Sequence, residues 1–387
     1  MNLEEKDRIG QYLRPQLSEI VFDELSDAYL AKAGIADILT GVPIPLRKTE
    51  LGNISTLTIA KCMAFVIGCD PEFKYKENYI AYITRTFEVR FADALLAEGV
   101  ETAATKKSYD YACILFRAAM QIEPDNANIY YCYGRACKDA YEAAAETLEA
   151  SDETEEFIGR FKAEALEAFE VATLKEPKFA DAYYFLGYAY LNMGLYVKAK
   201  LTWDEYMKLT ETDANTDETD ERMRDEGFRL RVKELREIRK ELAMRLKSLE
   251  KPVEIEKGYN LVLSGRYEEG IAALSEYKEG EFSSWWPLWF YLGIAYGELD
   301  ETDEAIACFT EVLKYAPSNI ESMEALIGLY EKTGDDEKVQ KYTKKIEIIK
   351  GNMEKDRQIA EENRQAAAEK QRLMTEVLTT EGTGKVN

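Results

Sequence analysis

The sequence predicts an all-α protein, a solenoid of paired amphipathic helices in two blocks with a helical N-terminal domain and a long connecting helix. Apolar residues recur every three or four positions along most of the chain, as they do on one face of an α-helix. The composition favours helix, because the 387 residues include only nine Pro and 22 Gly. One spacing of apolar and small residues also restarts several times, which is typical of repeat proteins.

The overall charge and hydrophobic content exclude several functional classes. A formal charge of -23, from 73 acidic and 50 basic residues, argues against nucleic-acid binding, because no basic surface displaces counterions from phosphate. A hydrophobic content of 46% allows a buried core. No apolar run reaches the roughly 18 residues of a membrane helix, and no secretory signal is recognisable. We therefore expect a cytoplasmic protein that binds neither nucleic acid nor a membrane.

The sequence contains no recognisable catalytic, cofactor or metal site. Histidine is absent, which removes the commonest general base and zinc ligand. No dinucleotide-binding, phosphate-binding or zinc-protease motif occurs. The six cysteines form no C-x-x-C pair and lie mostly in apolar helical patterns, so we expect reduced core thiols. These observations predict a protein that is not an enzyme and needs no cofactor.

The clearest repeat unit lies between Ala180 and Tyr206, where two amphipathic stripes are separated by a turn at residues 192–194. The residues that carry the pattern are Tyr183, Leu186, Gly187, Tyr190, Ala199, Trp203 and Tyr206. This pattern resembles the tetratricopeptide repeat, in which apolar, glycine or alanine, and aromatic residues recur at fixed offsets in two antiparallel helices. The resemblance implies a right-handed, bacterial-type α-solenoid.

The same offsets restart to give about six units in two blocks. The first block, residues 91–211, contains three units, and the second of these carries an acidic, alanine-rich insertion near residues 140–159. The second block, residues 252–349, contains three more, of which the unit from Trp289 to Pro317 matches best and the last is degenerate. Three consecutive units bury each other's apolar faces, so each block should support itself.

The other segments are predicted from composition and pattern. Residues 1–90 match no family. There, Leu17–Leu39 predicts an amphipathic helix, Pro43 and Pro45 predict extended backbone, and Leu57–Ile67 predicts a buried helix. Residues 212–251 should form an acidic loop and one long basic helix from Arg222. That helix either packs its apolar stripe on the first block or offers its basic face to an acidic surface. Residues 350–387 should form a polar helix and a disordered tail from Thr379.

The resemblance also implies a concave groove that binds a peptide or a partner helix. The repeat register places these residues in or beside it: Tyr131, Arg135, Tyr184, Tyr188 and Asn192 in the first block, and Tyr259 and Phe290 in the second. Three tyrosines stand where the family's carboxylate clamp needs polar or basic groups, which argues against binding a chaperone's C-terminal carboxylates. Aromatic rings suit an apolar or amphipathic segment, although they also fill the seams between repeats.

Trp285 and Trp286 are not required by the repeat pattern. Because adjacent residues point to different sides of a helix start, one indole should either contact a partner or plug the gap to the preceding helix. The leading hypothesis is a non-catalytic scaffold or adaptor that binds a protein or peptide partner in its concave faces. The alternative is a regulatory sensor whose solenoid closes around a short signalling peptide and acts on a protein effector. An enzyme within residues 1–90 is a third hypothesis, with no residue to support it.

Overall fold

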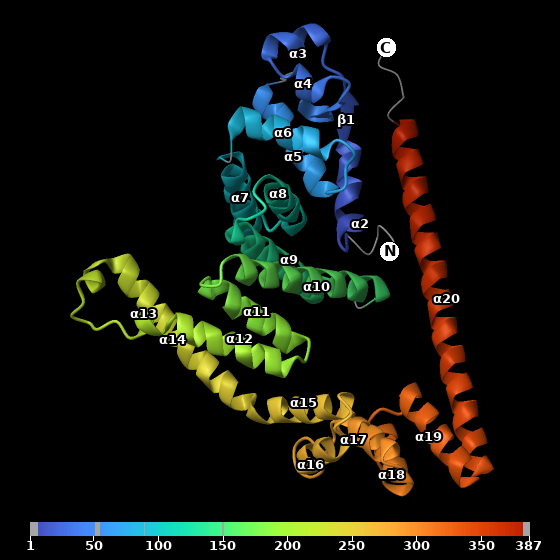
Figure 1. Ribbon diagram of the computed structural model, residues 1–387. Helices are drawn as coiled ribbons and strands as arrows, with labels where there is room; N and C mark the ends of the chain where they lie inside the picture. The colour runs from blue at the N-terminus through green and yellow to red at the C-terminus, as the bar shows by residue number, and fades with distance from the viewer. Residues whose placement is uncertain (1–6, 51–54, 89, 149–150, 382–387) are drawn as a thin grey trace. The chain divides into compact units, whose positions relative to one another are not determined.

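The computed structural model describes residues 7–50, 55–88, 90–148 and 151–381 (Figure 1). The chain divides into two compact units, Met1–Lys247 and Ser248–Asn387. Helices make up nearly all the regular structure of the described residues, which confirms the predicted all-α solenoid class. None of the helices in these ranges combines the length and the apolar character needed to cross a membrane.

The N-terminal region is a mixture of short elements and two longer helices. In chain order they are α2 Gly10–Leu13, η1 Arg14–Glu19, β1 Ile20–Asp23, α3 Asp27–Ala33, α4 Ala36–Leu39, β2 Ile44–Arg47, η2 Lys48–Glu50, α5 Thr56–Cys69 and α6 Lys76–Phe87. The predicted buried helix over Leu57–Ile67 is confirmed as α5, because nearly all its side chains from Ile59 onward are buried.

The single helix predicted over Leu17–Leu39 is wrong. Residues Ile20–Asp23 instead form a strand, β1, that pairs antiparallel with β2, so that Val21 lies opposite Leu46. The prolines at positions 43 and 45 hold this second segment in extended backbone and thereby supply the strand to which β1 pairs. Gly34, with a φ of 68°, then ends α3 in the left-handed conformation that favours glycine.

The first block consists of three packed helix pairs. Their helices are α7 Arg90–Glu101, continued by a π-helical turn η3 Thr102–Lys106, then α8 Tyr109–Ile122, α9 Ala127–Thr147, α10 Asp152–Lys175, α11 Ala180–Asn192 and α12 Tyr196–Leu209. The pairs are α7 with α8, α9 with α10, and α11 with α12. The insertion near residues 140–159 lengthens α9 and α10, although residues 149–150 lie outside the described ranges.

A glycine of the first helix lies directly against a large side chain of the second helix in each of these pairs. A Cβ atom added at Gly99 would lie 2.6 Å from Phe116, one at Gly134 2.7 Å from Phe169, and one at Gly187 2.1 Å from Trp203. Two pairs of the second unit repeat the arrangement, with Gly258 against Leu274 and Gly293 against Phe309. The repeat spacing in the sequence therefore encodes a close approach of two helices.

The first described residues, from Asp7 to Leu13, pack on the helices of the first block. Ile9 and Leu13 are fully buried, and the Tyr12 ring lies 5.0 Å from Phe157 of α10. Asp7 accepts a hydrogen bond from the buried Arg117 of α8 at 2.8 Å. Residues 1–247 thus form one compact unit that includes both the N-terminal region and the first block.

The acidic segment after α12 leads into the basic helix. It contains α13 Glu211–Ala214 and η4 Glu221–Arg224, and is followed by α14 Glu226–Ser248. The helix is shorter than the predicted Arg222–Lys251, because Asp225 caps its start by accepting from the Phe228 amide at 2.7 Å. Pro252 has no N–H to donate to the carbonyl of Ser248, which favours the end of α14 there.

The second unit contains three further helix pairs. They are α15 Glu250–Leu263 with α16 Tyr267–Ser275, α17 Trp286–Glu298 with α18 Thr302–Tyr315, and α19 Ile320–Thr333 with α20 Asp336–Glu381. Leu288, Leu292 and Met323 are fully buried in its core. The predicted disordered tail is wrong for residues 379–381, which belong to the 46-residue α20. The rest of that prediction falls on residues 382–387, outside the described ranges.

Candidate functional site

A cleft of about 670 Å³ lies in the first unit between α9 and α11 on one side and α14 on the other. Its walls are formed by Tyr131, Arg135, Asp181, Tyr184, Phe185, Tyr206, Arg231, Glu234, Leu235 and Ile238. It therefore brings together three of the predicted partner-binding residues: Tyr131, Arg135 and Tyr184. Because the first helices of two successive pairs line it, the cleft corresponds to the predicted groove of the first block.

Arg135 is held in place by aromatic neighbours. Its guanidinium lies 4.3 Å from the centre of the Phe185 ring and donates a hydrogen bond to the Tyr131 hydroxyl at 3.1 Å. The Tyr131 ring in turn packs 4.9 Å from Phe179. Stacking on a ring and a hydrogen bond fix the plane of a guanidinium, so Arg135 is pre-organised in the wall of the cleft.

Tyr184 lies at the centre of an aromatic wall. Its ring meets those of Phe185 and Tyr188 edge to face, at 5.0 and 5.1 Å, and lies 5.7 Å from Tyr206. The backbone carbonyl of Tyr184 accepts a hydrogen bond from the indole of the buried Trp203 at 3.1 Å. The wall therefore rests on the same Trp203 that packs against Gly187, which makes it a rigid surface.

The cleft carries charges of both signs. Arg135 and Arg231 are basic, whereas Asp181 and Glu234 are acidic. Loss of hydration raises the pKa of Asp181, and this effect outweighs the attraction of Arg135 and Arg231. The cleft thus presents hydrogen-bond donors and acceptors beside one aromatic surface.

Helix α14 forms a roof over one edge of the cleft. The Tyr188 hydroxyl donates to Glu241 at 3.1 Å, and the guanidinium of Arg245 lies 5.1 Å from the Tyr188 ring. Arg239 donates to the Thr210 hydroxyl at 2.7 Å. Desolvation, followed by the hydrogen bond between its hydroxyl and that of Tyr184, raises the pKa of Tyr188. Tyr188 therefore contacts α14 rather than lining the cleft.

Asn192 lies outside the cleft. It lines a small cavity beside Tyr141, Phe169 and Tyr188, at the opposite end of α11 from Asp181. Among the predicted residues of the first block, the structure brings Tyr131, Arg135 and Tyr184 together and places Tyr188 and Asn192 beside them.

The second unit has a groove of about 300 Å³ between α17 and α19. Its floor is Phe309, its walls include Ile294 and Leu329, and Glu298 and Lys332 also line it. Gly328 opens this groove, because no protein atom lies within 4 Å of the position its Cβ would take. Packing therefore gives no reason for glycine at this position. A glycine inside a helix also lowers stability by about 1 kcal/mol relative to alanine.

The predicted residues of the second block do not line this groove, although Phe290 contacts its floor residue Phe309. Tyr259 stacks on Tyr291 with ring centres 4.7 Å apart. Phe290 packs 5.9 Å from Phe309 and 6.1 Å from Trp286. Trp285 precedes α17 and packs against the core of the second unit. In the structure these rings fill seams between helices.

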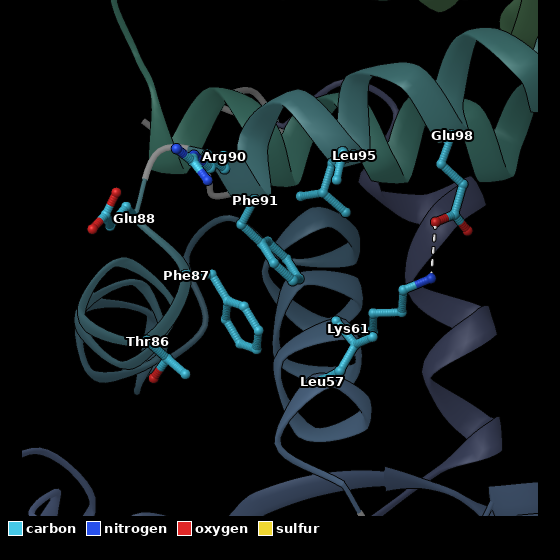
Figure 2. A pocket seen from close by; sticks show the side chains of 10 residues that line it. Leu57, Lys61, Thr86, Phe87, Glu88, Arg90, Phe91, Leu95 and Glu98 are labelled. Carbon is cyan, nitrogen blue, oxygen red and sulfur yellow. Dashed lines mark hydrogen bonds and ion pairs between the residues drawn. The ribbon is translucent and has the colours of Figure 1, made fainter.

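A third cavity, of about 510 Å³, lies in the N-terminal region among α5, α6 and α7. Figure 2 shows the rings of Phe87 and Phe91 facing its interior; their centres are 5.3 Å apart. The ammonium of Lys61 and the carboxylate of Glu98 pair at 3.1 Å on the far side. Glu88 and Arg90 also line the cavity, so it presents charged groups of both signs beside its aromatic rings.

Sequence reasoning missed the contribution of α14 and of Gly328. The heptad-like stripe of α14 indicated that it packs on the first block, but nothing in its spacing indicated that Arg231 and Glu234 face Asp181. A helix-interior glycine outside the repeat consensus was the available signal for the second groove. Among the described residues no group of three or more potential ligands could hold a metal ion.

Two tetratricopeptide repeat models match the chain, one over residues 159–205 and the other over residues 286–319. No curated protein matches it. Among solved structures, MamA from Desulfovibrio magneticus is 14% identical, with a TM-score of 0.27 over 57% of this chain and 96% of that chain. YrrB, described as a TPR protein with an unusual peptide-binding site, is 15% identical, with a TM-score of 0.26 over 60% and 91%. The P58(IPK) TPR domain is 13% identical, with a TM-score of 0.36 over 86% and 85%.

Proposed function

Because two stretches of the chain match the tetratricopeptide repeat, we propose that it is a non-catalytic scaffold that binds a segment of a partner protein in the cleft of the first unit. The observation that carries the proposal is the pre-organised Arg135 within the aromatic wall of Tyr131, Tyr184 and Phe185. Tyrosine and arginine dominate protein interfaces, because they give large contact areas and several hydrogen bonds at a modest cost in conformational entropy.

Capture of partners from a cell lysate tests this proposal. Tyr184→Ala combined with Arg135→Ala should remove at least one specifically captured protein, whereas Tyr130→Ala should retain it. Tyr130 is a matched control, because it is a half-buried tyrosine of α9 that lies outside the cleft. Equal capture of every protein by the double variant and the wild type would contradict binding in this cleft.

The groove between α17 and α19 is a second binding surface in the same proposal. If the two surfaces engage one partner, the second contact becomes intramolecular and raises the overall affinity without new contacts. A bulky residue in place of Gly328, such as Gly328→Leu, fills the groove and should weaken capture of that partner. Retention of the partner by this variant would restrict binding to the first unit.

The alternative is a regulatory sensor that closes around a short peptide. Its support is the set of side-chain contacts of α14 with Tyr188 and Thr210, which a peptide in the cleft would tighten without displacing the helix. Solution scattering measures the effect: a peptide selected for binding should decrease the radius of gyration. An unchanged radius at saturating peptide would leave the scaffold as the function.

A further inference from the structure

The contacts between α14 and the first block limit the shape of any occupant of the cleft. At one edge the Tyr188 hydroxyl touches Glu241 directly, at 3.1 Å, and at another Arg239 touches Thr210 at 2.7 Å. Only side chains therefore separate α14 from the helices beneath it at these points. An α-helix with its side chains is about 10–12 Å wide, so a helical ligand cannot enter unless these contacts break.

The buried residues of α14 support the same conclusion. Val232 and Leu242 are 1% and 0% exposed, so α14 is anchored by apolar burial as well as by polar contacts. Arg236 further donates to the backbone carbonyl of Ala214 at 2.9 Å, which ties the helix to the segment that precedes it. Displacing α14 would expose these side chains to water, at an unfavourable free energy.

The chemistry of the walls suits an extended backbone. An extended segment leaves its N–H and C=O groups unpaired, whereas a helix satisfies its own. The cleft supplies donors from Arg135 and Arg231 and acceptors from Asp181 and Glu234, so both kinds of backbone group find partners. Alternate side chains of an extended segment point to opposite sides, toward the aromatic wall and toward Leu235 of α14.

Resting on the function proposed above, we propose that the cleft takes an extended peptide segment of balanced charge, held between α14 and the helices α9 and α11. In this arrangement α14 is one wall of the binding site and not a plug that a partner displaces. The wall charges of Arg135, Arg231, Asp181 and Glu234 cancel, which matches a segment without a large net charge of its own.

Selection from two displayed libraries tests the shape of the ligand. The full chain is presented to short linear peptides and, separately, to the same number of randomised positions on the face of a stable helical scaffold. The linear library should yield binders that lose affinity with Tyr184→Ala, and the helical library should yield none that do. Helical binders that depend on Tyr184 would overturn the inference and leave the proposed function intact.

Removing the contacts between α14 and Tyr188 distinguishes the two roles of α14, as a wall of the cleft or as a competitor of the ligand. In Glu241→Ala/Arg245→Ala the contacts with Tyr188 are lost. If α14 is a wall, the affinity of a selected linear peptide, measured by fluorescence anisotropy, should fall about tenfold. If α14 is a competitor, the affinity should rise, and that result would overturn the inference.

Two further variants show whether a change in affinity comes from the wall of the cleft or from any substitution in α14. Glu237→Ala/Lys240→Ala removes one acid and one base from the exposed face of the same helix and should bind like the wild type. Arg231→Ala removes a donor from the wall without touching the contacts of Tyr188 and should also bind about tenfold more weakly. Failure of both libraries to give any binder that depends on Tyr184 or Arg135 would contradict the proposed function itself, and the inference with it.

Discussion

Glycine 187 and Trp203 make the tightest contact in the glycine pattern that runs through the helix pairs. A Cβ atom at position 187 would lie 2.1 Å from Nε1 of Trp203 and 2.3 Å from Cδ1. The indole cannot move aside easily, because it is fully buried and donates to the Tyr184 carbonyl. Trp203 thus sets the distance between α11 and α12 and also positions the aromatic wall of the cleft.

Gly187→Ala should therefore lower the free energy of unfolding by about 1–3 kcal/mol, as overpacked cores do. Gly159→Ala is the matched control, since no atom lies within 4 Å of its Cβ position on the exposed side of α10. There alanine should raise stability by about 0.5–1 kcal/mol through helix propensity. Urea unfolding measures both, and a neutral or stabilising Gly187→Ala would contradict the close packing.

Asp181 gives a pH-dependent prediction. Its pKa is raised in the folded chain because its charged form is poorly hydrated. A raised carboxyl pKa means that the folded state binds the proton more tightly than the unfolded state does. The stability that protonated Asp181 contributes is therefore present at low pH and is lost as the pH rises through the folded-state pKa. Asp181→Asn should thus be more stable than the wild type near neutral pH.

The advantage of Asp181→Asn should vanish below about pH 3, where the aspartate is protonated in both states. Urea unfolding of the two proteins across this pH range measures the difference. A constant difference at all pH values would mean that the amide acts by packing and that the carboxylate is adequately solvated.

At the scale of elements, a buried ion pair holds Asp7, which lies just before α2, against α8. Asp7 and Arg117 have side chains that are 10% and 5% exposed, and Arg14 also donates to Asp7 at 2.8 Å. Removing one partner of a buried pair leaves the other charge without compensation. The pair therefore links the residues that lead into α2 to α8.

Asp7→Ala should lower the stability of the first unit by about 3–5 kcal/mol. The control is Asp37→Ala, which breaks an exposed ion pair with Arg85 and should lower the stability far less, because water and salt screen an exposed pair. Thermal unfolding of both variants tests the comparison. Similar, small losses in the two proteins would show that the N-terminal segment contributes little to the unit.

The elements that the sequence predicted are those whose pattern is local. Helix α5, the paired helices and Gly187 follow from spacing along one segment. The antiparallel pair of β1 and β2 was missed because the apolar spacing in Leu17–Leu39 also fits a helix, and only pairing with residues 44–47 decides for a strand. The roof of the cleft likewise depends on contacts between residues more than 50 positions apart, such as Tyr188 with Glu241.

Within the candidate site, the repeat register predicted on which helix face a residue lies better than it predicted whether that residue lines a cleft. Tyr131, Arg135 and Tyr184 line the cleft, whereas Tyr259 and Phe290 pack against neighbouring rings. The register places a residue on a helix face but does not determine which neighbour covers it. Whether any of these residues binds a partner stays a prediction for the variants described above.

At the scale of the whole molecule, the division into two compact units predicts separate unfolding. Chains with several units commonly depart from a single two-state transition. Leu292→Ala removes a fully buried side chain from the second unit and should cost that unit about 2–5 kcal/mol. Calorimetry should show one transition shifted to lower temperature and the other unchanged. A single transition that shifts as a whole would show that the units unfold together.

The burial of Trp203 also makes the chain its own optical reporter. Trp203 is the one tryptophan of the first unit, while Trp285, Trp286 and Trp289 all belong to the second. Sealed against Gly187 and shielded from water, the Trp203 indole should emit at shorter wavelength than the three half-buried indoles. Replacing those three by phenylalanine would leave a spectroscopic signal that follows the aromatic wall beneath the cleft, with no added label.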